Sequence, residues 1–287
     1  MSRHLFFSKE KLRFPSLAGE WYSGSKRELN KEIDKLLNKV KSQKIEGEIF
    51  GILVPHASYS FSGTVAASAY KVIENRYFET VVLIGDSHYE YFQGVSVWDR
   101  GEWITPLGKV KIDEVLAREL LKFSKRFFVK DSVHLFEHAL EVQLPFLQKV
   151  LKNFRILPLI FGSENKDWKI LAKAILKLMK RKKILVLAST DLSHYPPCEI
   201  ARKVDSISIQ GILSSDPYIF EKMLKRLGKN FSNIETFVCS KNATKTILQI
   251  SKTLNGKATL LKYLNSGDIL KSEKKRAVGY ASICFYL

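Results

Sequence analysis

The sequence predicts an α/β protein, a three-layer α/β/α sandwich with a mixed, largely parallel central sheet. Several apolar runs, such as "TVVLIG" and "KILVLAS", are continuous rather than alternating, which is typical of strands in a sheet covered on both faces. Segments with helical spacing of apolar residues separate these runs. No linker rich in proline, glycine or serine divides the 287 residues, so we expect a single domain over 1–287.

Each predicted strand is a short run of apolar residues. In chain order, the predicted strands cover 48–55, 80–88, 154–162, 183–195, 258–267 and 277–287. We expect the last two to include antiparallel neighbours, and this is why the predicted sheet is mixed rather than purely parallel.

Helices are predicted where apolar residues recur every three or four positions. The clearest cover 27–40, 113–124 with Asp113 as N-cap, 166–181, and a segment that begins after Gly63 and ends near 74. Segment 134–151 is expected to be helical but interrupted near Pro145, because proline lacks the backbone N–H. Residues 234–251 are expected to form a short strand or turn that leads into a helix.

The chain carries a formal net charge of +18, which raises the question of a nucleic-acid or acidic-membrane partner. Its lysines, however, are spread over helical faces, and aromatic residues are not interleaved with the basic clusters as in a base-stacking groove. The pattern therefore disfavours nucleic-acid binding. Solvated lysine faces in a heat-adapted, archaeal or thermophilic protein explain the charge better.

Targeting and cysteine usage indicate a soluble cytoplasmic protein. The start, "MSRHLFFSKE", lacks the apolar core of a signal peptide, and no apolar run approaches the roughly 20 residues of a membrane span. The three cysteines, Cys198, Cys239 and Cys284, are few and widely spaced, which argues against a disulfide framework.

Polar residues follow three of the predicted strands. His56 comes after "GILVP", His88 after "VVLIGDS", and Asp191 with His194 after "ILVLAST". In open α/β sheets, ligands bind outside the carboxyl ends of the strands, so these side chains converge if the strands are parallel neighbours. The alternative for each histidine is a hydrogen-bonded loop residue without a function of its own.

Two further segments carry metal-ligand chemistry. Cys239 precedes a predicted helix, whose N-terminus favours the metal-binding thiolate, although a small buried hydrophobic residue is the alternative. In "HLFEHALE", His134 and His138 are four residues apart, as are Glu137 and Glu141, so each pair would share a helix face. The order H-x-x-E-H occurs in inverzincins, but these residues are equally candidates for orienting other ligands, or for purely structural pairing.

Seven ordered motifs resemble the Memo family, also called protein B of the AmmeMemoRadiSam system. They are "RFPSLAGEWY" (13–22), "VPHASYSFSG" (54–63), "IGDSH" (84–88), "WITPLG" (103–108), "EHALEVQLPFL" (137–147), "STDLSHY" (189–195) and "CSKNATKTIL" (239–248). Each motif is weakly specific, but together they cover nearly the whole chain. Memo proteins are in turn similar to LigB-type class III extradiol dioxygenases, which are non-haem iron enzymes with an α/β/α fold.

The resemblance implies a set of site residues. It implies metal ligation by His56, His88 and Cys239, and places Asp191 and His194 beside the metal, with Glu137 and His138 as residues that orient the ligands. If there is a reaction, His194 is the candidate general acid or base, because of its ordinary pKa of about 6.5, and Asp191 would orient it.

This chain departs from the family pattern at three of these motifs. Ser58 and Ser240 stand where the family usually has glycine, Asp86 replaces the usual proline or asparagine, and the proline expected soon after Cys239 is absent. We expect these changes to alter the shape of the pocket more than its ability to bind a metal.

Function remains a choice between two classes. A His2Cys set leaves coordination positions open, and iron or copper is favoured with zinc as a third candidate. The first hypothesis is therefore a metalloprotein with redox or dioxygenase-like chemistry on a substrate that the sequence does not identify. The second is a non-catalytic module that binds a small molecule or a phosphopeptide in the same pocket, a role suggested by animal Memo proteins. The family also implies a functional link to a radical-SAM protein.

Overall fold

The computed structural model describes residues 11–163 and 166–287. The leading segment "MSRHLFFSKE", on which the expectation of no signal peptide rests, lies outside the described residues. Within the described part of the chain, no helix combines the length and the apolar character that are needed to cross a membrane.

The central sheet has eight strands in the order β10-β11-β2-β9-β3-β8-β4-β7. Its four middle strands are mutually parallel: β2 (Ile49–Val54), β9 (Ile184–Ser189), β3 (Thr80–Asp86) and β8 (Arg155–Phe161). On one side, β11 (Gly279–Tyr286) pairs antiparallel with both β2 and β10 (Lys257–Asn265). On the other side, β4 (Val95–Val97) pairs antiparallel with β8 and parallel with β7 (Phe127–Phe128). The prediction of a mixed, largely parallel sheet is confirmed.

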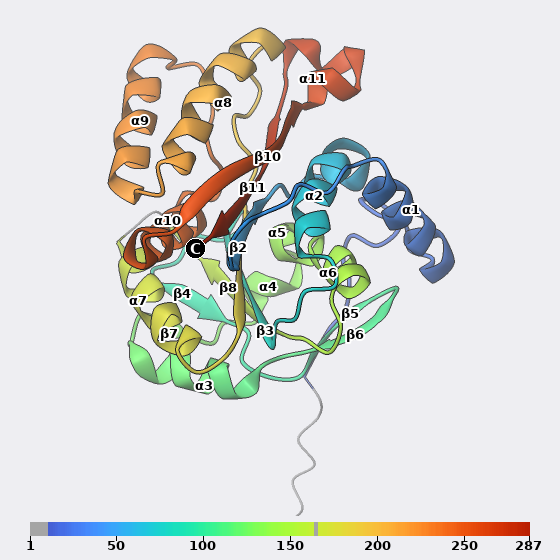
Figure 1. The fold of residues 1–287 in the computed structure, drawn as a ribbon, viewed down its shortest axis with the longest axis vertical. Coiled ribbons are helices and arrows are strands. Elements are labelled where there is room, and N and C mark those ends of the chain that lie inside the picture. Colours follow the sequence, from blue (N-terminus) through green and yellow to red (C-terminus); the bar gives the residue numbers. More distant parts are fainter. Residues whose placement is uncertain (1–10, 164–165) are drawn as a thin grey trace, which may run out of the picture.

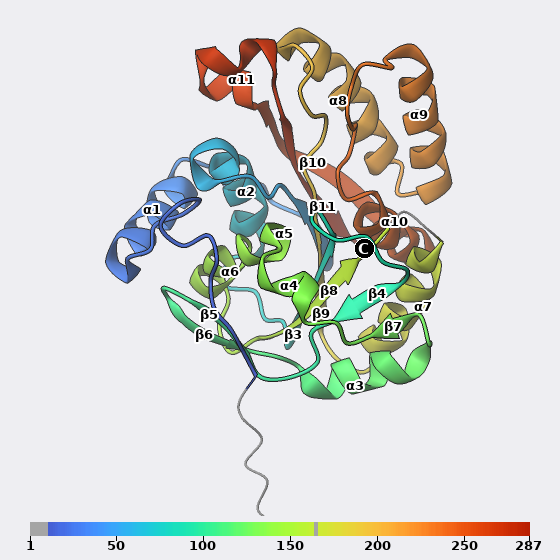
Figure 2. The ribbon, with the colours of Figure 1, turned by 180° about the vertical axis from the view of Figure 1, so that it is seen from behind.

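Helices cover both faces of this sheet, as Figures 1 and 2 show from opposite sides. One face packs against α3 (Glu114–Phe123), α7 (Asp167–Met179) and α10 (Lys241–Leu254), with α8 (Cys198–Leu213) and α9 (Pro217–Asn230) extending that layer. The other face packs against α2 (Tyr59–Ile73) and α6 (Leu144–Val150), with α1 (Lys26–Asn38) outside α2. The structure is therefore the three-layer α/β/α sandwich that the sequence predicts.

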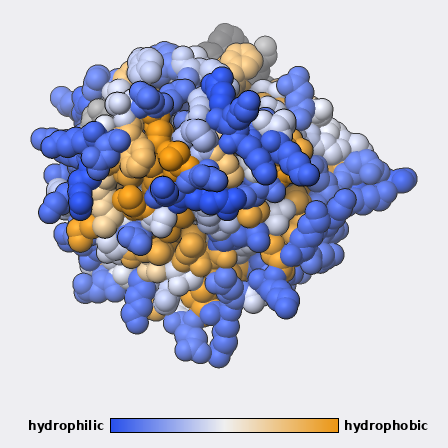
Figure 3. All heavy atoms as spheres, turned by 90° about the horizontal axis from the view of Figure 1, so that it is seen from above, coloured by the Kyte–Doolittle hydropathy of each residue, from blue (hydrophilic) through white to orange (hydrophobic). Residues whose placement is uncertain are grey.

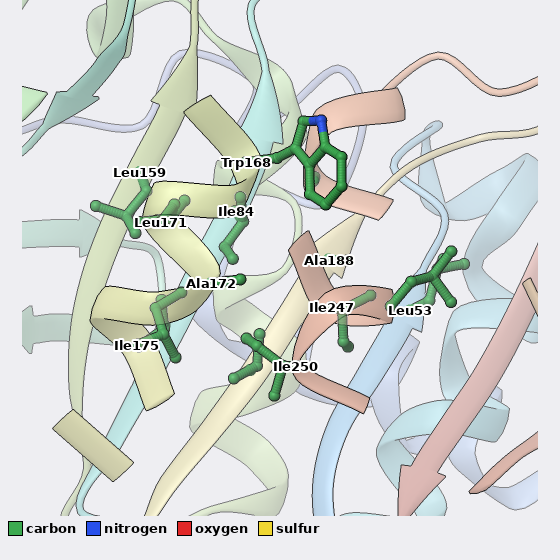
Figure 4. Packing of buried hydrophobic residues seen from close by; sticks show 14 of the residues in the cluster. Leu53, Ile84, Leu159, Trp168, Leu171, Ala172, Ile175, Ala188, Ile247 and Ile250 are labelled. Atoms are coloured by element: carbon green, nitrogen blue, oxygen red, sulfur yellow. The ribbon is translucent and has the colours of Figure 1, made fainter. Parts of the chain in front are cut away.

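The strands are buried on both faces, which explains their continuous apolar sequences. All six residues of β2 and all six of β9 are buried. Figure 4 shows Leu53 and Ala188 of these strands beside Ile247 of α10, while Ile84 lies near Leu171 of α7. Alternate residues, including Ile52 and Leu187, belong to the core on the opposite face.

A small second sheet was not predicted from the sequence. It has three strands, β1 (Leu12–Arg13), β5 (Glu102–Thr105) and β6 (Gly108–Lys111). Its strands are two to four residues long, too short for a periodic pattern to indicate them. The pairing of β1 with β5 holds the start of the described chain against a segment some ninety positions away.

Two helix predictions were wrong in detail. Helix α2 begins at Tyr59 rather than after Gly63, which lies inside it. A Cβ atom on Gly63 would lie 2.8 Å from Leu36 Cδ1, so glycine there permits close approach of α1 rather than starting a helix. Segment 134–151 is divided among α4 (Ser132–Leu135), α5 (His138–Glu141) and α6, and Pro145 occupies the first turn of α6, where no N–H is needed.

Between the last two strands, β10 and β11, lie α11 (Ser266–Ile269) and a 3-10 helix, η1 (Lys271–Lys275). In Figure 1 they lie near the top, beside α8. Viewed from that side, hydrophilic side chains cover much of the surface and hydrophobic atoms show between them (Figure 3).

Candidate functional site

Three adjacent parallel strands carry the polar residues to one edge of the sheet. His56 lies two positions beyond β2, Asp191 two beyond β9, and His88 two beyond β3. The ring centroids of His56 and His88 are 5.0 Å apart. Cys239 Sγ lies 3.2 Å from His56 Nε2. The structure thus brings together the two histidines and the cysteine expected to form the centre.

The hydrogen bonds of Ser189 determine which nitrogen of His56 is free. The Ser189 hydroxyl donates to the carbonyl oxygen of Ala139 over 2.6 Å and is 3.1 Å from His56 Nδ1. Because the hydroxyl has a single proton, it accepts from His56, so the proton of the imidazole is on Nδ1. Nε2 is therefore the nitrogen that faces Cys239. Burial alone would lower the pKa of His56, but the sulfur raises it, and Nε2 is the nitrogen that a metal would take once its proton is lost.

Glu137 orients the ring of His88 as Ser189 orients that of His56, through a hydrogen bond at Nδ1. Its carboxylate accepts a hydrogen bond from His88 Nδ1 over 2.9 Å and another from the His88 backbone N–H over 2.8 Å. Burial alone would raise the pKa of Glu137, but His88 and His138 lower it to about 2. A carboxylate on Nδ1 leaves Nε2 of His88 available and increases its basicity, an arrangement that recurs around protein-bound metals.

His138 lies closer to the centre than the sequence indicated. Its ring centroid is 4.3 Å from that of His88 and 5.1 Å from that of His56. One ring nitrogen from each of these three histidines lies within 4.8 Å of the other two, so they could together hold a metal ion. The structure therefore offers two candidate sets of metal ligands, and both contain His56 and His88. The third ligand is either Cys239 or His138.

Cys239 is held where the chain turns into α10. Its sulfur accepts a hydrogen bond from the backbone N–H of Asp191 over 3.1 Å. Burial by itself would raise the pKa of the thiol, but His56, His194 and His88 around it lower the pKa well below its ordinary value. This environment favours the thiolate, the form that binds metal.

Asp191 and His194 complete the buried cluster. Asp191 accepts a hydrogen bond from the His56 backbone N–H over 2.8 Å, and burial raises its pKa. Burial alone would lower the pKa of His194, but Cys239 and Asp191 raise it. Among the described residues, none forms a hydrogen bond with the buried Nε2 of His194 that meets standard geometry.

Asp86, one of the departures from the family pattern, lies against the start of α10. The Asp86 carboxylate accepts hydrogen bonds from the backbone N–H groups of Asn242 and Ala243 at the start of α10, each over 3.0 Å. The carboxyl group therefore lies at the N-terminus of a helix, and burial raises its pKa to about 7. Ser58 and Ser240 have φ values of −58° and −102°, which non-glycine residues adopt freely.

Two residues of "HLFEHALE" lie away from the centre. His134 is buried beside Ser96, Trp98 and Trp103, and its Nε2 is 3.0 Å from Ser96 Oγ. Glu141 instead forms a buried ion pair with Arg13. The expectation that the i, i+4 pairs share helix faces was wrong, because the backbone is extended at Glu137, between α4 and α5.

Some residues of the site were not singled out from the sequence. Ser189 and Gln143 fix the surroundings of His56, since Gln143 Nε2 donates to Ser189 Oγ over 2.9 Å. Trp21 packs on His138 with ring centroids 4.9 Å apart, and the Tyr89 hydroxyl is 3.2 Å from His138 Nδ1. The signal for three of them was their presence within the motifs "RFPSLAGEWY", "EHALEVQLPFL" and "STDLSHY".

The fold and this cluster define a class of protein: an α/β/α sandwich with a site rich in histidine, and containing one cysteine, at the carboxyl edge of its parallel strands. The family model described as Memo-like protein matches residues 13–284, and the chain belongs to the Memo family.

Relatives share nearly the full length of the chain. It is 37% identical to a MEMO1 family protein of Methanobrevibacter smithii and 33% identical to one of Sulfurisphaera tokodaii, in each case over 96% of this chain and 99% of the relative. A crystal structure of an uncharacterized protein from Escherichia coli K12 has a similar fold, with a TM-score of 0.54. That similarity covers 83% of this chain and 99% of the other at 10% identity, so it bears on the fold alone.

Proposed function

We propose that this Memo protein binds one metal ion through His56, His88 and Cys239 and uses it in redox or dioxygenase-like chemistry. The observation that carries the proposal is the 3.2 Å separation of His56 Nε2 and Cys239 Sγ. Nitrogen and sulfur ligands about 2.0–2.3 Å from a tetrahedral ion lie roughly 3.5 Å from each other, so this pair is already spaced for shared coordination. The Nδ1 atoms of both histidines are engaged elsewhere, which leaves Nε2 for the metal.

The donor set favours iron or copper, with zinc as the third candidate. Two imidazoles and one thiolate suit a soft or borderline ion and leave coordination positions open. Bound iron or copper would supply one-electron chemistry and a site for oxygen or a polar substrate.

The surrounding residues have roles that follow from their contacts. His194 would take up or release a proton at Nε2, which is buried and forms no standard hydrogen bond within the described chain. Asp191 would position His56 by accepting its backbone N–H. Glu137 would hold His88 in the orientation that exposes Nε2.

The decisive experiment measures metal content in anaerobically purified protein by mass spectrometry. We expect about one equivalent of iron or copper in the parent protein and less than about a tenth of that in His56→Ala and in Cys239→Ala, because loss of a direct ligand removes most of the affinity. Cys198→Ala is the matched control, because Cys198 contacts Asn265 and Arg202 away from the site. It should retain the metal.

A second variant distinguishes the two ligand sets. If His138 orients rather than binds, His138→Ala will weaken affinity without abolishing it, by roughly 10–100-fold. Full metal in Cys239→Ala together with none in His138→Ala would instead assign the third ligand to His138. A parent protein that takes up no metal, even when reconstituted with Fe(II), Cu(I) or Zn(II), overturns the proposal. In that case, phosphopeptide binding by the metal-free protein would favour the non-catalytic module.

A further inference from the structure

A separate cavity lies at the opposite end of the central strands, where β2 and β9 begin. Its lining includes Ile49 at the start of β2 and Ile184 at the start of β9, whereas His56 and Asp191 follow the ends of these strands. Since a strand rises about 3.3 Å per residue, the length of β2 separates the cavity from the histidines by about 20 Å. The cavity has a volume of about 770 Å³, within the usual range of small-molecule sites.

The lining of this cavity is mainly apolar. Four of its residues are almost fully buried and four are partly buried: Ile49, Phe50, Phe78 and Ile184, and then Phe123, Leu176, Met179 and Leu254. They come from the strand starts and from the C-terminal ends of α3, α7 and α10, and α7 and α10 pack directly on each other. An apolar ligand body would lose its contact with water here, at a gain that rises with each buried methylene group.

Lysines surround this apolar surface. The lining contains five of them, Lys173, Lys177, Lys180, Lys182 and Lys183, and one acidic side chain, Glu48. Lys182 forms an ion pair with Asp113 at 2.7 Å. The other four have no ion-pair partner among residues 11–163 and 166–287. A cavity with this excess of positive charge selects an anionic headgroup and repels a cationic one.

We propose that this cavity binds a soluble anionic amphiphile, an unbranched aliphatic chain that ends in a carboxylate. The chain lies against the apolar lining, and the carboxylate lies among the lysines of the C-terminal part of α7 and the residues that follow it. A membrane surface is the competing partner, but the recessed shape and the nine apolar lining residues, of which only Leu287 is largely exposed, fit a single chain better than a flat lipid surface.

The first test is calorimetric titration of the full-length protein with dodecanoate below its micelle-forming concentration. We expect one dodecanoate per chain and affinity about tenfold weaker for decanoate, since each methylene contributes about threefold to fourfold. Dodecyltrimethylammonium has the same chain and the opposite charge, and should bind at least tenfold more weakly. Equal binding of the two amphiphiles overturns the proposal, as does binding only to micelles or anionic vesicles.

The second test uses surface variants that leave the core intact. Lys177→Gln combined with Lys180→Gln should weaken dodecanoate binding by about fivefold, because two cations near the carboxylate are lost. The matched control is Lys222→Gln with Lys229→Gln on α9, which should bind as the parent does. Equal weakening in both pairs contradicts the proposed location. His56→Ala should bind dodecanoate normally, so this proposal and that of the metal centre fail independently.

Discussion

Glu137 shows how one buried carboxylate organises the candidate centre. It accepts hydrogen bonds from both the ring and the backbone N–H of His88, and from the backbone N–H of Ala139 over 3.0 Å. All three contacts are with donors, and a carboxylate can accept all of them at once. A glutamine side chain of the same shape cannot accept all three hydrogen bonds, because its NH2 group is itself a donor.

This asymmetry leads to a prediction for Glu137→Gln. We expect metal affinity to fall by roughly 10–100-fold, because the variant retains the ligands but loses the group that orients His88. Competition with a chromophoric chelator measures the affinity. Glu119→Gln, which alters an exposed ion pair with Arg181, is the control and should bind metal as the parent does. Unchanged affinity in Glu137→Gln would contradict the role of the carboxylate in orienting His88.

At the scale of elements, Arg13 of β1 anchors α4 and α5, the short helices on either side of Glu137. The Arg13 guanidinium is fully buried and donates to the carbonyl oxygens of His134 and Glu137, over 2.7 and 3.1 Å. It also forms an ion pair at 2.7 Å with Glu141, which accepts hydrogen bonds from the Ser16 backbone and the Tyr22 hydroxyl. Arg13 thus holds the extended turn at Glu137 that separates α4 from α5.

We predict that Glu141→Gln destabilises the protein by about 3–5 kcal/mol, because it leaves the Arg13 charge buried without its counter-ion. Urea unfolding monitored by circular dichroism measures the change. Glu74→Gln removes an ion pair with Lys71 on the helix surface and should cost less than about 1 kcal/mol. A loss in Glu141→Gln no larger than in this control would contradict the role of the buried pair.

The same carboxylate makes stability depend on pH. Burial alone would raise the pKa of Glu141, but Arg13 and the hydrogen bonds from Ser16, Tyr22 and Leu17 lower it below the ordinary value. A depressed pKa in the folded state contributes stability above the ordinary pKa of about 4.5, and this contribution is lost as the pH falls toward the folded-state pKa. The difference in unfolding free energy between the parent and Glu141→Gln should therefore shrink below about pH 4.5. A difference that grows on acidification would contradict this.

For the molecule as a whole, the last strand makes the sheet continuous. Strand β11 lies between β10 and β2 and pairs with both, so residues near the two ends of the chain share one core. The single domain over 1–287 stays a prediction.

We therefore predict one cooperative unfolding transition. Near- and far-ultraviolet circular dichroism should report the same midpoint. Ile283→Ala in β11 should lower the midpoint of both signals by the same amount. We expect it to reduce the free energy of unfolding by about 2–5 kcal/mol, because Ile283 is fully buried. Leu260→Ala, at a half-exposed position of β10, should cost much less. Two separable transitions would show that the chain folds as two domains.

The sequence alone was sufficient for the layers and for the place at which polar side chains gather. Six apolar runs match the six long strands. Five of these strands are buried almost throughout and need an apolar side chain at nearly every position, whereas β10 is mostly half-buried. Histidines directly after two such strands, and an aspartate and a histidine after a third, indicated the edge at which a site would form. The sequence also predicted the N-cap of α3: the Asp113 side chain accepts a hydrogen bond from the Leu116 N–H.

Only the tertiary structure decided which members of "HLFEHALE" face the centre. Local spacing favoured one helix with paired faces, yet Arg13, more than a hundred residues earlier, binds two carbonyl oxygens and holds an extended residue between two short helices. His138 consequently joins His56 and His88, while His134 lies beside Ser96 and two tryptophans. Local patterns describe neighbours along the chain, and these positions depend on contacts between residues far apart in it.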